Sequence, residues 1–501
     1  MTLRDIGVAA ARARAGRTEP LLEIDDIQGN ILAGFDTAYQ DFVFLRIVDV
    51  GMTKKWLTRL APAVTTMRQV LRRRSTPARR DSAPMVGVGF GYPGLTLLAP
   101  QAQAMRDVPF TQGLHQRSRM LGDPIDERDP GHCANWIVGG PATQADIVLV
   151  IACDDRSARA AVPDLAAEGV EVIQVESCAR LPGPPEGHEH FGFRDPISQP
   201  GVRGRISADP DVLLHPSVDP ARPDEAKPGQ KLVWPGEFVF GYPTQDPFDP
   251  WHPGLPAQAG PTWGRNGSLL VLRRLRQDVD AFEQFISDAL AQVHTVAELA
   301  TMTREQLRAR LMGRWRHGTP VMLSPAAENL DIAYNAHRVD NFGYAGDRGT
   351  DPLGLICPQA AHIRKAYPRD HETSVDTKAS METHRILRRG MPFGSAHAAD
   401  RGLLFAAYQT SLERQFEYIT RSWLNNPYLR AEEEGHDPIA GQYNRAAVGS
   451  HARGFSLPYL RTDGAVGHLR LTLPRQWTVP TGGGYFFVPS ITALRNHIGT
   501  R

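Results

Sequence analysis

Alternating hydrophobic and polar positions predict two successive series of strands and helices along the chain. Two segments of the first series, residues 52–73 and 156–169, have the spacing of amphipathic helices. Apolar runs typical of strands lie between them, at residues 41–50, 84–98 (ending in a Gly-Pro turn), 145–153 and 170–177. Two β-α-β units in succession are typical of a ferredoxin-like α+β fold.

A second series of the same kind follows residues 205–265, a stretch rich in proline and aspartate that is typical of a loop or linker. The pattern predicts strands at 267–276, 402–411 and 482–490, helices at 278–293 and 412–424, and a short terminal helix. We therefore expect a mobile arm at residues 1–23, a first module at 24–230 and a second at 231–501. A long irregular insertion interrupts the second module.

The overall composition is that of an ordinary globular protein. Hydrophobic residues make up 41% of the 501 positions, charged residues make up 22%, and the net charge is +1. The sequence has no polybasic patch and no long apolar segment, so nothing in it suggests nucleic acid or a membrane as a partner. The four cysteines form no CxxC pair, and the first residues lack the apolar core of a signal peptide. These features favour a cytoplasmic location.

The motifs of several common enzyme classes are absent from the sequence. There is no HExxH, GxSxG or GxxxxGK[ST]. The segment EGHEH at residues 186–190 carries two histidines, but no further ligands follow at the spacing of a structural zinc site. We interpret EGHEH as a solvated loop.

His362 lies in the locally apolar run LGLICPQAAHI and permits two interpretations. It is either a core histidine or an axial haem ligand, because one neutral imidazole in an apolar pocket suffices to hold haem iron. On the second interpretation, Arg364 and Lys365 supply positive charge for the haem propionates. Cys357 is a competing thiolate ligand, but no glycine-rich cysteine loop surrounds it and no CxxCH segment is present.

Three arginines, Arg385, Arg388 and Arg389, occur in HRILRRGMPFG. Arginines at this spacing before Gly-Met-Pro-Phe-Gly are unusual for a surface helix. Salt bridges on a solvated face account for at least two of the three.

The sequence resembles the dye-decolourising peroxidases, a family of haem enzymes. The resemblance covers nearly the whole chain after about residue 24, with the motifs in the family's order. These motifs are DIQGNILAGF, FGFRDPISQPGVRG, GEFVFGYP, RNGSLLVLRRLRQDVDAF, CPQAAHIRKAYPRD, RILRRGMPFG, RGLLFAAYQTSLERQFEYI, DPIAGQ and GGGYFFVPS. The resemblance implies two ferredoxin-like modules packed as a dimeric α+β barrel-type pair, with one haem b per chain in the C-terminal module.

The resemblance also implies roles for individual residues. Asp195 matches the acid of the family's Gly-x-x-Asp-Gly motif, and this acid transfers the proton of hydrogen peroxide. Arg388 matches the arginine that stabilises charge as the O–O bond breaks, and His362 matches the proximal iron ligand, which is the metal site. The other matches are apolar residues of the distal pocket and an acid behind the histidine, at Leu403, Phe405 and Asp437.

The resemblance further implies hydrogen peroxide and a small organic donor, such as a phenol or dye, as substrates of a monomer or homodimer. Trp263 and Tyr408 are candidate relays for electrons from bulky donors. One position departs from the family motif, because Pro196 stands where the family has glycine. Proline restricts φ and the residue before it, so an alternative is a haem-binding or haem-handling protein with weak peroxidase activity.

Overall fold

The strands of both expected modules combine into one closed antiparallel sheet. The computed structural model describes residues 18–75, 83–155, 168–215, 222–249, 252–430, 434–442 and 453–500. Within these ranges the sheet has nine strands. They are β1 (Tyr39–Ile47), β2 (Met85–Phe90), β3 (Ile147–Cys153), β4 (Val170–Ala179), β9 (Ser268–Gln277), β12 (Leu387–Arg388), β13 (Met391–Phe393), β14 (Gly402–Gln409) and β17 (Thr478–Val488).

The order of the strands shows how the barrel is built from two halves. The first half runs β4-β1-β3-β2 and the second runs β13-β14-β9-β17, with β12 beside β14. The halves meet at two single residue pairs, Phe393 with Cys178 and Phe487 with Phe90. The expected fold class, α+β with two ferredoxin-like modules, is confirmed.

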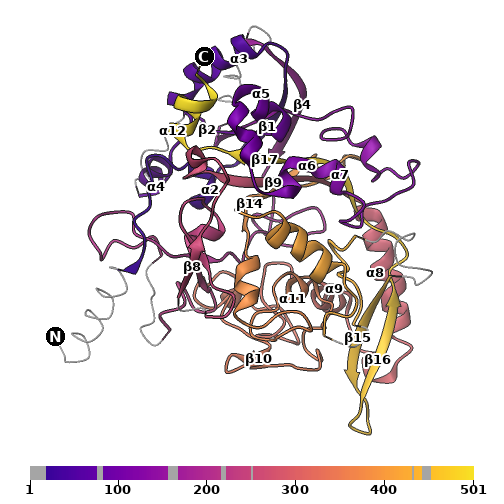
Figure 1. Cartoon of the computed structure of the whole chain (residues 1–501). Helices are drawn as coiled ribbons and strands as arrows, with labels where there is room; N and C mark the ends of the chain where they lie inside the picture. Colours follow the sequence, from indigo (N-terminus) through magenta and orange to yellow (C-terminus); the bar gives the residue numbers. More distant parts are fainter. Residues whose placement is uncertain are drawn as a thin grey trace, which may run out of the picture.

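Helices surround the barrel in two groups (Figure 1). Beside the N-terminal strands lie α3 (Val50–Leu60), α4 (Met67–Ser75), α5 (Tyr92–Leu98), α6 (Val108–Gln112), α7 (Leu114–Arg117) and the terminal turns α12 (Ile491–Ala493) and η12 (Leu494–Ile498). Beside the C-terminal strands lie α8 (Val279–Val293), α9 (Arg304–Met312), α11 (His362–Ala366) and the hairpin of β15 (Gly454–Leu460) and β16 (Val466–Thr472).

The barrel strands separate two apolar clusters because successive side chains of a strand point to opposite faces. In β1, Val43 and Leu45 pack in one cluster with residues of α3 and α5. Phe42 and Phe44 pack in the other cluster with residues of α4. Because each face packs in one of these two clusters, most barrel strands are buried on both faces.

Two predicted elements differ from the structure at proline positions. Residues 84–98 are not one strand, because β2 ends at Phe90 and α5 begins at Tyr92 with Pro93 in its first turn. Proline fits the first turn of a helix, where its missing N–H is not needed. Residues 52–73 form two helices, α3 and α4, separated by a turn that contains Pro62. Proline inside a helix removes a hydrogen bond.

The predicted helix at 412–424 is wound as two π-helical turns, η10 (Glu413–Glu417) and η11 (Ile419–Leu424). The predicted helix at 156–169 falls almost wholly outside the described residues. Residues 205–265, expected to be a loop or linker, include a buried segment at 232–242 with Val233, Phe238 and Val239 in the second apolar cluster. Short elements give this stretch its shape: β6 (Leu232–Val233), β7 (Pro243–Gln245) and β8 (Pro253–Pro256).

The end of the expected arm at residues 1–23 is packed rather than mobile. Glu19 forms a 2.8 Å ion pair with Arg203, and Leu22 is 3% exposed. Residues 1–17 lie outside the described ranges. Across the described chain, no helix is long and apolar enough to cross a membrane.

Candidate active site

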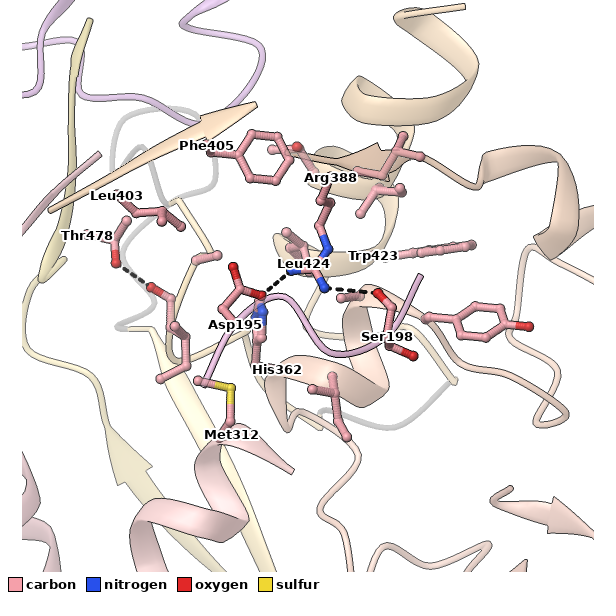
Figure 2. A pocket seen from close by; sticks show the side chains of 18 of the residues that line it. Asp195, Ser198, Met312, His362, Arg388, Leu403, Phe405, Trp423, Leu424 and Thr478 are labelled. Atoms are coloured by element: carbon pink, nitrogen blue, oxygen red, sulfur yellow. Dashed lines mark hydrogen bonds and ion pairs between the residues drawn. The ribbon is translucent and has the colours of Figure 1, made fainter. Parts of the chain in front are cut away.

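A cavity of about 280 Å³ lies between the second half of the barrel and the segments around it. Its walls come from the loop at 189–200, β9, α11, β14 and the π-helical turns η10 and η11. Most of the wall is apolar. The charged and imidazole side chains at the wall include Asp195, His362 and Arg388 (Figure 2).

His362 is the first residue of the short helix α11. Its Nδ1 atom lies 2.7 Å from Oδ2 of Asp437. Because Asp437 is fully buried and accepts at that position, Nδ1 carries the proton and Nε2 keeps its lone pair. Within the described residues, Nε2 forms no hydrogen bond. The imidazole therefore presents a nitrogen lone pair that can coordinate a metal ion at the cavity wall.

Asp437 is held in a dense set of hydrogen bonds behind the histidine. Its Oδ1 atom accepts from the backbone N–H groups of Ile439 at 2.7 Å and Ala440 at 2.9 Å. Burial alone would raise the pKa of Asp437, but His362 and these N–H groups hold that pKa below its usual value. The same carboxylate raises the pKa of His362 against the opposing effect of burial.

Asp195 and Arg388 form an ion pair at the wall of the same cavity. Nη1 of Arg388 donates to Oδ1 of Asp195 at 2.5 Å, and Nη2 donates to the carbonyl of Ser198 at 3.0 Å. Gln199 exchanges two hydrogen bonds with the backbone of Arg388, at 3.0 and 3.1 Å. The arginine is thereby fixed to the loop that carries the acid. Asp195, Arg388 and His362 line the same cavity.

Leu403 and Phe405, two residues apart on β14, also line the cavity (Figure 2). The ring of Phe405 lies 5.9 Å from that of Phe416 on η10. Trp423 and Leu424 from η11 extend this apolar wall. These side chains form the apolar part of the cavity wall that Asp195 and Arg388 also line.

The structure does not bring Arg364 to the cavity, so its prediction as a cofactor-binding residue is wrong. Arg364 is fully buried and donates to Asp351, to the Cys357 carbonyl and to His371. Residues two apart on a helix point in nearly opposite directions, so His362 and Arg364 cannot both face one cavity. Lys365 likewise points elsewhere, to the carbonyls of Trp423 and Asn426.

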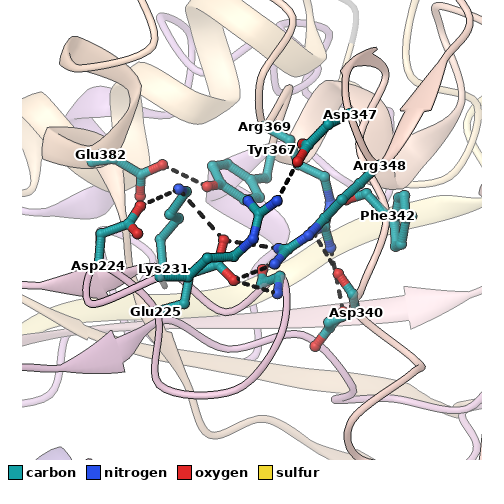
Figure 3. A network of polar contacts seen from close by, with 12 residues as sticks. Asp224, Glu225, Lys231, Asp340, Phe342, Asp347, Arg348, Tyr367, Arg369 and Glu382 are labelled. Atoms are coloured by element: carbon teal, nitrogen blue, oxygen red, sulfur yellow. Dashed lines mark hydrogen bonds and ion pairs between the residues drawn. The ribbon is translucent and has the colours of Figure 1, made fainter. Parts of the chain in front are cut away.

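Arg194 and Arg273 also line the cavity, and three further arginines supply positive charge at its wall: Arg314, Arg369 and Arg385. Within the described residues they share two carboxylates. Asp340 pairs with Arg314 at 2.7 Å and with Arg369 at 3.3 Å, and Glu382 pairs with Arg385 at 2.9 Å. Figure 3 shows the network around Arg369, in which Tyr367 donates to Glu382 and Arg369 lies over the ring of Phe342. In this group of five side chains, three arginines face two carboxylates.

These features fit a haem. A flat apolar cofactor matches the apolar walls, its iron matches the free Nε2 of His362, and its carboxylates match the surplus arginine charge. Cys357 does not compete for the iron, because it is buried outside the cavity wall and burial raises the pKa of its thiol to about 11. The interpretation of EGHEH as a solvated loop is wrong for Glu189, which is buried at the cavity wall.

The remaining candidates lie away from the cavity wall. Arg389 donates to the backbone carbonyls of residues 30–32 and so has a structural position. Trp263 stacks on His497, and Tyr408 is buried inside the barrel. The sequence interpretation missed Gln199, although it stands four residues after Asp195 in a motif already singled out.

Comparison with known proteins agrees with this geometry. Residues 26–171 match the DyP dimeric alpha+beta barrel domain, and residues 249–449 match the C-terminal domain of Dyp-type peroxidases. The chain is 30% identical to a dye-decolorizing peroxidase of Mycena epipterygia, over 95% of this chain and 87% of that protein. The chain belongs to the dye-decolourising peroxidase family.

Further relatives support the membership. "Peroxidase 2" of Mycetinis scorodonius is 29% identical over 95% of this chain and 87% of its own length. The solved structure of an ancestral D-type dye-decolorizing peroxidase has a TM-score of 0.78 at 29% identity and covers 96% of this chain and 100% of its own. A dye-decolorizing peroxidase in complex with 2,6-dimethoxyphenol has a TM-score of 0.74 at 26% identity, with 96% and 100% coverage. As a member of this family, the protein is an oxidoreductase that acts on peroxide.

Proposed function

We propose that the protein binds one haem b per chain through His362 and uses hydrogen peroxide to oxidise small organic donors such as phenols and dyes. The observation that carries the proposal is the Asp195–Arg388 pair on the wall of the cavity that His362 also lines. When bound through His362, the haem would supply the iron and the redox chemistry for the reaction between peroxide and the organic donor.

The protein residues manage protons and charge. The Asp195 carboxylate accepts a proton from one oxygen of hydrogen peroxide and returns it to the other oxygen, which leaves as water. The Arg388 guanidinium stabilises the negative charge that develops on the leaving oxygen. Asp437 fixes the tautomer and the orientation of His362, so that Nε2 faces the cavity.

The position of Asp195 supports a peroxidase over a haem-handling protein with weak turnover. That alternative rests on Pro196, which could have turned the acid away. In the structure the Asp195 carboxylate lies on the cavity wall and contacts Arg388.

The test is a stopped-flow measurement of the reaction between purified holoenzyme and hydrogen peroxide. Asp195→Asn preserves the shape of the side chain but removes its ability to accept a proton. We expect this variant to bind haem normally and to react with peroxide about 10²–10⁴-fold more slowly. A rate equal to that of the parent protein would remove Asp195 from its role and favour the haem-handling alternative.

We also propose that the protein works as a monomer or homodimer. Sedimentation of the purified holoenzyme measures this directly.

A further inference from the structure

Glu189 is a buried carboxyl at the wall of the cavity, six residues before Asp195. Its Oε2 atom accepts from the backbone N–H of Phe191 at 2.8 Å, and its Oε1 atom accepts from that of Phe193 at 2.9 Å. Gln277 on β9 donates its side-chain amide to Oε2. One carboxylate therefore joins the turn at residues 191–193 to a strand of the barrel.

The backbone of this segment closes on itself around the carboxylate. The N–H of Glu189 donates to the carbonyl of Phe193 at 2.9 Å, and the N–H of Gly192 donates to that of Glu189 at 2.8 Å. The N–H of Asp195 donates to the carbonyl of Gly187 at 2.9 Å. The conformation of the turn thus determines the backbone position of Asp195.

Neighbouring elements anchor the outer side of the same turn. The Phe191 ring packs 4.7 Å from that of Phe282 on α8, and Arg308 on α9 donates to the Phe191 carbonyl at 2.5 Å. The N–H of Arg194 donates to the carbonyl of Arg316 at 2.9 Å. The turn is fixed from outside by these contacts and from inside by Glu189.

Burial of this carboxyl works against stability. No ion pair to Glu189 occurs within the described residues, and burial raises its pKa to about 7 despite three N–H donors. Asp195 raises the pKa of Glu189 further, and the guanidinium groups of Arg308 and Arg316 bind the backbone of the turn. Because burial of Glu189 costs free energy, we infer that this side chain fixes the conformation of the turn and adds no net stability.

We propose that Glu189 is a positioning residue for Asp195. Its carboxylate sets the turn at residues 191–193 and thereby holds the Asp195 carboxyl against Arg388 at the cavity wall. The inference rests on the proposed role of Asp195 in the peroxide reaction. It assigns to Glu189 no contact with peroxide or with the cofactor.

Glu189→Gln in the holoenzyme tests the proposal. An amide cannot accept from both N–H groups through both of its terminal atoms, so the turn shifts. A misplacement of about 1 Å costs roughly 10²-fold in rate. We expect the second-order reaction with hydrogen peroxide to slow by about that factor, while haem content and the KM for the donor stay unchanged. A crystal structure of the variant should show the Asp195 carboxyl displaced from Arg388.

A double variant separates positioning from a structural effect. If Glu189 acts through Asp195, Glu189→Gln combined with Asp195→Asn reacts no more slowly than Asp195→Asn alone. Multiplied effects in the double variant would overturn the proposal. Glu186→Gln is the matched control, because Glu186 lies in the same loop with its side chain 86% exposed and should react like the parent.

The two possible failures are distinguishable. If Asp195→Asn is slow but Glu189→Gln reacts at the parent rate with full haem content, the positioning proposal is wrong and the proposed function stands. If Asp195→Asn itself reacts at the parent rate, the proposed function fails. Should Glu189→Gln not accumulate, Glu189→Asp gives the same comparison, because the shorter side chain cannot reach both N–H groups.

Discussion

Nη1 of Arg388 lies 2.5 Å from Oδ1 of Asp195, although the two residues are 193 positions apart in the sequence. The contact joins the irregular loop after β4 to the short strand β12. Arg388 also donates to the Ser198 carbonyl, so the loop and the strand can shift only together. The acid and the positive charge that we propose for the peroxide reaction are therefore held as one unit.

His362→Ala should purify with little haem. Asp437 orients the imidazole, and His384, the second histidine at the described cavity wall, already uses both ring nitrogens, on the Arg414 carbonyl and on Asp376. The measurement is the ratio of Soret to protein absorbance after purification. His337→Ala, which changes an exposed histidine, is the control and should keep full haem content. An unchanged Soret band in His362→Ala would show that another group binds the iron.

Arg388→Leu should bind haem but react with peroxide about 10²–10³-fold more slowly, because one preorganised donor is lost. Stopped-flow absorbance measures the rate. The neighbouring Arg389→Leu is the matched control. It should leave this rate intact and instead lower the free energy of unfolding by about 2 kcal/mol, since buried carbonyls at residues 30–32 lose their donor. The reverse pattern would mean that Arg389 is the functional arginine.

Asp437→Asn should weaken the hold on haem by about 10–100-fold. The amide keeps the size of the carboxyl but removes its negative charge. That charge orients His362 and makes Nε2 a stronger ligand for iron. The rate of haem transfer to an excess of apomyoglobin reports this change without any turnover. Asp331→Asn, at an exposed position, is the control. Equal transfer rates in both variants would exclude a role for Asp437 behind the histidine.

Glu237→Gln should stabilise the protein at pH 8 and have little effect at pH 5. Glu237 is 1% exposed, and burial raises its pKa from 4.5 to about 7. Because the folded state binds this proton more tightly, the stabilisation is present below pH 4.5 and is lost as pH rises through about 7. The loss is on the order of 3 kcal/mol. Thermal unfolding midpoints of parent and variant at both pH values measure it, and a difference that does not grow with pH would contradict the prediction.

The local pattern of the sequence was sufficient to predict several elements and motifs. Strands β1, β3, β9 and β14 and helix α8 follow from short apolar runs and from the spacing of apolar residues over 279–293. His362, Asp195 and Arg388 could be selected because each stands in a motif that resembles those of the dye-decolourising peroxidases. These properties depend on neighbours in the sequence.

The tertiary structure alone decided which candidates meet. Arg364 follows His362 by two residues, yet helical geometry turns it into a buried network with Asp351, whereas Arg369 and Arg385 reach the cavity. Glu189 looked like part of a solvated loop, but Phe191 and Phe193 pack into a core built from α8 and α9 and carry it inside. Burial and the direction of a side chain depend on elements distant in the sequence, and local patterns contain no information about their placement. The sequence determined which groups were available for chemistry, and the closure of the barrel determined which of them share a cavity.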